Sequence, residues 1–194
     1  MSRTQEILNE ANERLTIAKC GLAMVLSGQG EGRVGLRNVA VFGRMVTFAT
    51  NNFRSVVPNF EKWDSDAKVR HFDNDECRYM YQLRNVIEKQ ARTPTSVSVH
   101  IHSFNTNDIS KFERPPSAGS FFIGDQNGGT GWMVVDSEGN ETPYYLALPP
   151  EIGNVWLSLP ENDGRNAGEV ASKYVASLEA YFIEVKAFIG QAQP

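Results

Sequence analysis

"RYMYQLRNVIEKQARTPTSVSVHIH", residues Arg78 to His102, contains the point at which the chain changes from helix to strand. Up to about Ala91 the apolar residues recur at spacings of three and four, which is the period of one helix face. After Thr93-Pro94 apolar and polar residues alternate, which is typical of a strand. The stretch therefore predicts a core-facing helix over about 75–91 that leads directly into a β region.

The same helical period extends to both sides of this stretch. It predicts helices over about 4–27 and 34–55, and a long C-terminal helix that begins near Asn166. The segment between Pro58 and Asp75 is predicted to form a short helix or an irregular stretch. Each amphipathic helix needs a partner for its apolar face, so the pattern indicates a helical bundle.

Residues 95–160 carry several short runs of strand-forming residues. The turn sequences "QNGGT" and "SEGN" separate them, and Asn-Gly and Gly-Asn pairs favour tight hairpins. We expect a small, mostly antiparallel sheet built from sequential hairpins. The predicted fold is α+β in a single domain: a bundle of four to five helices over 1–93 and 165–192, with an inserted antiparallel β-sheet over 95–160.

The composition is that of an ordinary globular chain, with 41% hydrophobic and 22% charged residues among 194. A chain of this length needs no disulfide framework, so Cys20 and Cys77 are expected to be small buried residues. No leader and no apolar run long enough to span a membrane is evident, and the expected location is the cytoplasm. The net charge of −4 gives no overall attraction to nucleic acid, although a local basic patch is compatible with it.

Arg84 and Asn85 stand at the edge of the apolar stripe of the 75–91 helix. Glu88 follows Arg84 by four residues, so one interpretation is an ion pair within the helix. The other is that Arg84, Asn85 and Lys89 hold a phosphate, because an arginine fork binds phosphate through two bonds and a lysine adds a point charge. These residues support binding or structure, and the sequence alone leaves both open.

The "LRN" motif on a late helix of a bundle, with a basic residue five positions beyond the arginine, resembles the HEPN superfamily of higher eukaryote and prokaryote nucleotide-binding domains. The helix order also resembles that of uncharacterised bacterial proteins. The resemblance covers about residues 1–93 and the last helix. It implies a homodimer and a metal-independent endoribonuclease of a toxin-antitoxin or phage-defence system, in which Arg84 stabilises charge on the scissile phosphate and a histidine transfers the proton.

The chain departs from this motif where the histidine is expected, because Lys89, Gln90 and Ala91 stand there. A lysine with an ordinary pKa of about 10.4 is a poor base at neutral pH, so Lys89 fits binding better than cleavage. His100, on the strand that follows the motif helix, is the candidate to replace the missing histidine. Catalytic activity is therefore left open, with Arg84, Asn85, Lys89 and His100 as its candidate residues.

Two other groups of residues are candidate binding sites. His100 and His102 share one face of a predicted strand, but no third ligand follows from the sequence, so we expect no metal and no cofactor. Arg33, Arg37 and Arg44 lie along one face of the second helix and suit RNA or an acidic partner.

Two hypotheses from different classes follow. In the first, a HEPN-like bundle binds RNA or a nucleotide through Arg84, Asn85 and Lys89. In the second, the chain is a non-enzymatic structural or interaction domain with a cognate protein partner, in which the same residues form only an ion pair within the helix.

Overall fold

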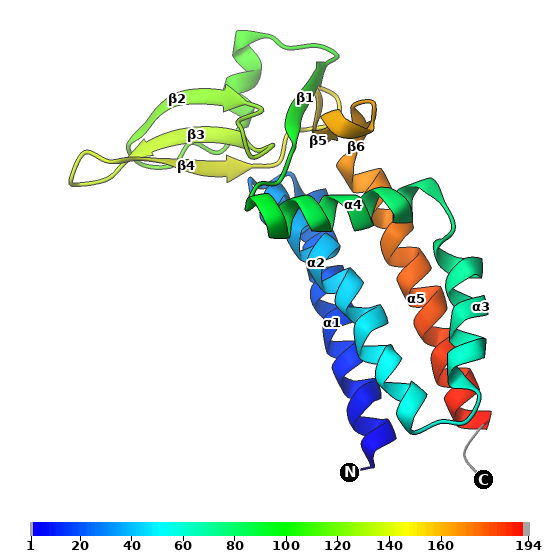
Figure 1. Cartoon of the computed structure of the whole chain (residues 1–194). Helices are drawn as coiled ribbons and strands as arrows, with labels where there is room; N and C mark the ends of the chain where they lie inside the picture. Colours follow the sequence, from blue (N-terminus) through cyan, green and yellow to red (C-terminus); the bar gives the residue numbers. More distant parts are fainter. Residues whose placement is uncertain (1, 192–194) are drawn as a thin grey trace. The chain divides into compact units, whose positions relative to one another are not determined.

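A computed structural model describes residues 2–191. Its elements follow the order shown in Figure 1. The described chain divides into two compact units. The helical unit comprises residues 2–22, 35–93 and 169–191, and the β unit comprises residues 23–34 and 94–168. The last turn of the first helix and the first residues of the second belong to the β unit.

The helical unit is built from α1 (Arg3–Ser27), α2 (Gly32–Asn51), α3 (Phe60–Phe72), α4 (Asp75–Gln90) and α5 (Ala167–Gln191), with the short η1 (Asn52–Ser55) after α2. Helices α1, α2, α3 and α5 run in alternating directions, and α4 lies across them (Figure 1). Tyr81 on α4 contacts both neighbours: Arg44 of α2 lies 4.5 Å from its ring centre, and the ring of Tyr174 on α5 lies 6.0 Å away. Helix α4 is thus packed against α2 and α5.

Local sequence accounts for both ends of α4. The side chain of Asn74 accepts a hydrogen bond of 2.9 Å from the backbone N–H of Cys77, which caps the first turn. Ala91 ends the helix in the left-handed conformation, with φ of 52°. Between these ends, Met80, Leu83 and Ile87 are buried, as the helical period predicts.

Two glycines allow close helix packing. A Cβ at Gly21 of α1 would lie 2.6 Å from the carbonyl oxygen of Gly35 on α2, so only glycine fits where these helices meet. A Cβ at Gly43 of α2 would lie 2.5 Å from the ring of Tyr174 on α5. The bundle therefore depends on small residues at these two contacts.

The β unit contains two three-stranded antiparallel sheets. One is the meander of β2 (Ala118–Ile123), β3 (Thr130–Val135) and β4 (Glu141–Leu146). The other has the order β1 (Ser96–Ile101), β5 (Gly153–Leu159) and β6 (Arg165–Asn166). Short 3₁₀ helices, η2 (Thr106–Lys111) and η3 (Pro160–Asn162), lie in the connections. Phe121 packs between Phe112 and Trp132, at 4.8 Å and 5.0 Å between ring centres.

The predicted α+β class, mainly helical with an inserted antiparallel β region, is confirmed. The prediction of one sheet made of sequential hairpins is wrong for β1, because it pairs with β5, opposing Val97 to Leu157. Hairpin signals are local and cannot report a pairing across more than fifty residues. The uncertain segment after Pro58 is a regular helix, α3.

One of the two cysteines departs from expectation. Cys77 is buried, whereas Cys20 is exposed. Cys20 follows the buried Ala18 by two residues, which places it on the opposite side of α1 from the stripe that packs in the core.

Candidate functional site

Arg84 lies at the surface of the helical unit, with 26% of its side chain exposed. Its Nη2 lies 2.6 Å from Glu88 Oε2, and its Nη1 donates to Asn85 Oδ1 at 3.1 Å. The guanidinium carbon also lies 5.9 Å from the ring centre of Phe48 on α2. The ion pair with Glu88 that the sequence indicates is therefore present, and Arg84 additionally contacts an aromatic ring.

Asn85 and Lys89 are exposed on α4. Asn85 accepts the hydrogen bond from Arg84. Lys89 forms no ion pair within residues 2–191, so its ammonium group faces solvent. The predicted trio thus consists of one paired arginine, its amide neighbour and one solvated lysine.

His100 lies on β1 in the β unit and is exposed. Its ring centre lies 4.7 Å from that of His102, and His102 Nε2 lies 3.2 Å from the amide nitrogen of Asn154. Within residues 2–191, no group of three or more metal-ligating side chains occurs. The helical unit contains Arg84, Asn85 and Lys89. His100 lies in the β unit.

The three arginines of α2 have different surroundings. Arg33 belongs to the β unit, and Arg37 is exposed on the helical unit. Arg44 is half-buried, with its guanidinium carbon 4.7 Å from the ring centre of Phe48 and 4.5 Å from that of Tyr81. Its Nη1 also approaches Thr47 Oγ1 at 3.4 Å.

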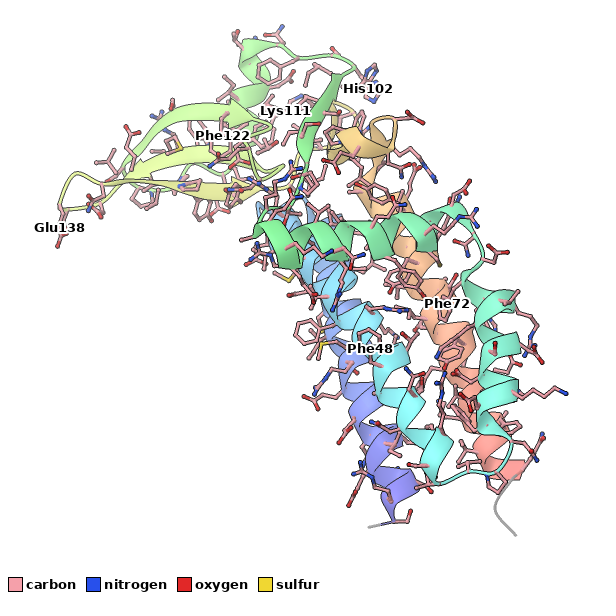
Figure 2. The ribbon with its side chains drawn as sticks, viewed as in Figure 1. Phe48, Phe72, His102, Lys111, Phe122 and Glu138 are labelled. Carbon is pink, nitrogen blue, oxygen red and sulfur yellow. The ribbon has the colours of Figure 1, made fainter. Side chains whose placement is uncertain are left out.

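Arg44 has no carboxylate partner in the part of the chain that the structure describes. We call Arg44, Phe48, Tyr81 and Arg84 the Phe48 cluster. Figure 2 labels Phe48 on α2. The fold thus brings together two arginines, Arg44 and Arg84, that the sequence singled out separately.

A pocket of about 420 Å³ lies within the helical unit next to this cluster. Four of its lining residues come from four separate elements: Arg44 from α2, Arg54 from η1, Lys68 from α3 and Tyr81 from α4, and Ser65 of α3 also lines it. Val69 and Phe72 add apolar surface, and Figure 2 labels Phe72 at the end of α3. Asp73 also lines the pocket and pairs with Arg78 at 2.5 Å.

A buried carboxylate, Asp64, lies beneath the pocket cations and is fully inaccessible to solvent. Its Oδ2 lies 2.7 Å from Lys68 Nζ and 3.5 Å from Arg54 Nη2, and its Oδ1 accepts a hydrogen bond of 2.6 Å from the hydroxyl of Tyr181. Tyr181 also lies 2.8 Å from Thr50 Oγ1, and Lys68 donates to Asn51 at 2.7 Å. Burying a charge without such partners costs several kcal/mol, and the two short contacts of Lys68 fix the position of its ammonium group.

The electrostatics of the pocket are shaped by burial and by the cations. Burial lowers the pKa of Lys68, its contact with Asp64 opposes this, and the positive charges of Arg54 and Arg44 lower it further. Burial raises the pKa of Tyr81 to about 12, against the opposing effect of Arg44. Tyr81 is therefore a neutral hydrogen-bond donor at physiological pH.

Sequence reasoning missed Arg54, Asp64, Lys68 and Tyr81. One signal was available, since Asp64 and Lys68 stand four residues apart, the spacing of an ion pair on a helix. This spacing indicates an ion pair only on a helix, and the sequence predicts a short helix or an irregular stretch there. Arg54 and Tyr181 approach Asp64 only in the tertiary structure, so no local spacing predicts these contacts.

Comparison with known protein families, with curated proteins and with solved structures finds no match to this chain. The resemblance to the HEPN superfamily therefore stays a prediction. Among residues 2–191, none of the helices has both the length and the apolar character required to cross a bilayer.

Proposed function

We propose that the helical unit binds single-stranded RNA at the Phe48 cluster. The observation that carries the proposal is the surroundings of Phe48, whose side chain is 44% exposed and has the guanidiniums of Arg44 and Arg84 over its ring, at 4.7 Å and 5.9 Å. An exposed aromatic ring flanked by two arginines combines the two contacts that proteins use for single strands: stacking for bases and cations for phosphates.

The hydrogen-bonding capacity of the arginines supports this proposal. The contacts of Arg84 with Glu88 and Asn85 leave N–H donors of its guanidinium unused, and Arg44 has no competing carboxylate in the described chain. Arginine binds phosphate through paired N–H groups and also stacks on planar rings. The exposed cations Arg37 and Lys89, on the same two helices, add charge for a flexible anionic strand.

The HEPN resemblance extends the proposal to a homodimer that cleaves RNA without metal, in a toxin-antitoxin or phage-defence role. Lys89 stands where such enzymes place a histidine, and His100 is the candidate replacement. RNA cleavage in the presence of a chelator, together with the sedimentation coefficient of the protein, tests this extension separately from binding.

The binding experiment compares Arg84→Ala with Arg78→Ala on fluorescently labelled single-stranded RNA in a metal-free buffer. Arg78 is the matched control because it is also an ion-paired arginine of α4, held by Asp73 and Asp75 rather than by Phe48. We expect Arg84→Ala to weaken binding at least about tenfold, equivalent to ~1.4 kcal/mol. The slope of log affinity against log salt concentration should also become shallower by about one, which is the contribution of one phosphate contact. Equal affinities for the two variants would contradict the proposal.

One observation favours the alternative hypothesis, in which Arg84 has only a structural role: its 2.6 Å contact with Glu88. If the helical unit is only a structural or protein-interaction domain, wild-type protein should show no RNA binding above that of Arg84→Ala. The same binding curves therefore decide between the two functions.

A further inference from the structure

We propose that the pocket lined by Arg44, Arg54, Lys68 and Tyr81 is a binding site for a small phosphate monoester. This site goes beyond the RNA-binding proposal, since it needs neither Arg84 nor the exposed ring of Phe48. The two share only Arg44, whose guanidinium contacts Phe48 and also lines the pocket.

The convergence of cations is the first step of the argument. Three positively charged side chains from α2, η1 and α3 line one space of about 420 Å³, and Tyr81 adds a hydroxyl from α4. Like charges repel each other, so their convergence favours an anion that lies between them. A volume of this size is in the range of small-molecule sites.

Charge compensation within the unit is incomplete. Lys68 and Arg54 share the single buried carboxylate of Asp64, and the second partner of Arg54 is Glu61 at 3.4 Å. Arg44 has no carboxylate partner within the described residues. The three cations of the pocket therefore exceed by one the two carboxylates that contact them, Asp64 and Glu61. The lining carboxylate of Asp73 is paired with Arg78, so the excess positive charge favours an anion.

Lys68 and Arg54 still have N–H donors available for a ligand. The ammonium group of Lys68 gives one donor each to Asn51 and Asp64, and has one more to offer. The contacts of Arg54 with Glu61 and Asp64 are long, at 3.4 Å and 3.5 Å, and leave its fork able to turn toward a ligand. Phosphate oxygens match these donors because they accept several charge-assisted bonds at once.

Asp64 is a positioning residue of this site. It is buried beneath the cations and is held on its other side by Tyr181. The ammonium group of Lys68 is thereby fixed before any ligand arrives, which lowers the entropy lost on binding. Val69 and Phe72 line the remainder of the pocket and give apolar surface to the organic part of an ester.

The titration behaviour of Lys68 agrees with this geometry. Burial lowers the pKa of Lys68, and the neighbouring cations Arg54 and Arg44 act in the same direction. A phosphate dianion between these groups would offset both effects. Ligand binding should therefore raise the pKa of Lys68, which is measurable from the side-chain carbon resonances.

The test uses the full chain and titrates phenyl phosphate, inorganic phosphate and sulfate by calorimetry. The variants are Lys68→Met and Arg54→Gln, and Lys62→Gln is the matched control because Lys62 is exposed on the same helix and does not line this pocket. We expect phenyl phosphate to bind wild type and Lys62→Gln equally, with at least tenfold weaker binding in Arg54→Gln and in Lys68→Met. Binding of sulfate or inorganic phosphate as tight as that of phenyl phosphate would overturn the assignment to an ester.

If Lys68→Met does not fold, Arg54→Gln and the Lys68 titration in wild type decide the question. Unchanged affinity in Arg54→Gln, or a Lys68 pKa that stays constant on saturation, would overturn the proposal. The Arg84→Ala variant separates this proposal from RNA binding. It should keep phenyl phosphate binding while losing RNA, so failure of one proposal leaves the other measurable.

Discussion

The helical unit contains two ion pairs of nearly identical local geometry but different surroundings. Asp64 and Lys68 on α3, and Arg84 and Glu88 on α4, are both four residues apart, with N–O distances of 2.7 Å and 2.6 Å. The two cations are similarly exposed, with Lys68 at 25% and Arg84 at 26%, so the difference lies in the carboxylates: Asp64 is completely buried and Glu88 is 39% exposed. The N–O distance of an ion pair therefore says little about its contribution to stability, which depends on burial and on further partners.

The buried pair is held by a network, and the exposed pair is not. Asp64 contacts Lys68, Arg54 and Tyr181, which belong to three different elements. Arg84 contacts Glu88 and Asn85 on its own helix, and Phe48 on α2. We therefore assign Asp64 to the stability of the bundle and Arg84 to ligand contact.

The largest expected effect comes from removing Asp64. In Asp64→Ala, Lys68 and Tyr181 lose a partner inside the bundle, and breaking a buried pair costs ~3–5 kcal/mol. Urea denaturation measures the loss, with Glu61→Ala as the control for an exposed carboxylate on the same helix. A destabilisation as small as that of Glu61→Ala would remove the distinction between the two pairs.

The next effect comes from the hydroxyl of Tyr181. Tyr181→Phe removes a hydrogen bond to the buried carboxylate and should cost ~1.5–3 kcal/mol, because bonds to charged groups are the stronger ones. Tyr174→Phe is the matched control, since the buried hydroxyl of Tyr174 has no hydrogen-bond partner in residues 2–191. Thermal unfolding of the two variants should differ clearly, and equal melting temperatures would count against the network.

A smaller effect is expected for the exposed pair. A double-mutant cycle of Arg84→Ala and Glu88→Ala should give a coupling energy of ~0.3–0.5 kcal/mol, as for other pairs at this spacing on a helix. The cycle is measured by urea denaturation of the four proteins. A coupling above ~2 kcal/mol would show that Arg84 is a structural residue like Asp64.

The smallest effect is a pH dependence from Glu184. Its hydrogen bond with His71, at 2.6 Å, is the main reason that the pKa of Glu184 is lowered from its ordinary value, and Arg70 adds to the effect. A lowered folded pKa contributes stability above the unfolded value of about 4.5, and this stability is lost as pH falls through the folded pKa. Glu184→Gln should flatten the stability curve below about pH 4.5, and an unchanged acid slope would contradict this.

The sequence predicted much of the fold because helix period and turn chemistry are local. The cap at Asn74, the end of α4 near Ala91 and the start of α5 near Asn166 all follow from neighbouring residues. The pairing of β1 with β5 could not be predicted in this way. It depends on two segments meeting across a long connection, which no short pattern reports.

The candidate site was only partly predictable for the same reason. Arg44 and Arg84 were singled out by their helix positions, and the pair with Glu88 by spacing. Their meeting at Phe48 depends on how α4 crosses α2. Lys68 and Arg54 approach one carboxylate from different elements, so their pocket exists only once the bundle has formed.

The most direct test of this account measures stability and RNA affinity on the same Arg84→Ala protein. We predict a free energy of unfolding within ~0.5 kcal/mol of wild type, because the pair with Glu88 is exposed. We also predict RNA binding weakened at least about tenfold, or ~1.4 kcal/mol, with Arg78→Ala unchanged in affinity. A clear loss of stability without loss of RNA affinity would contradict the account.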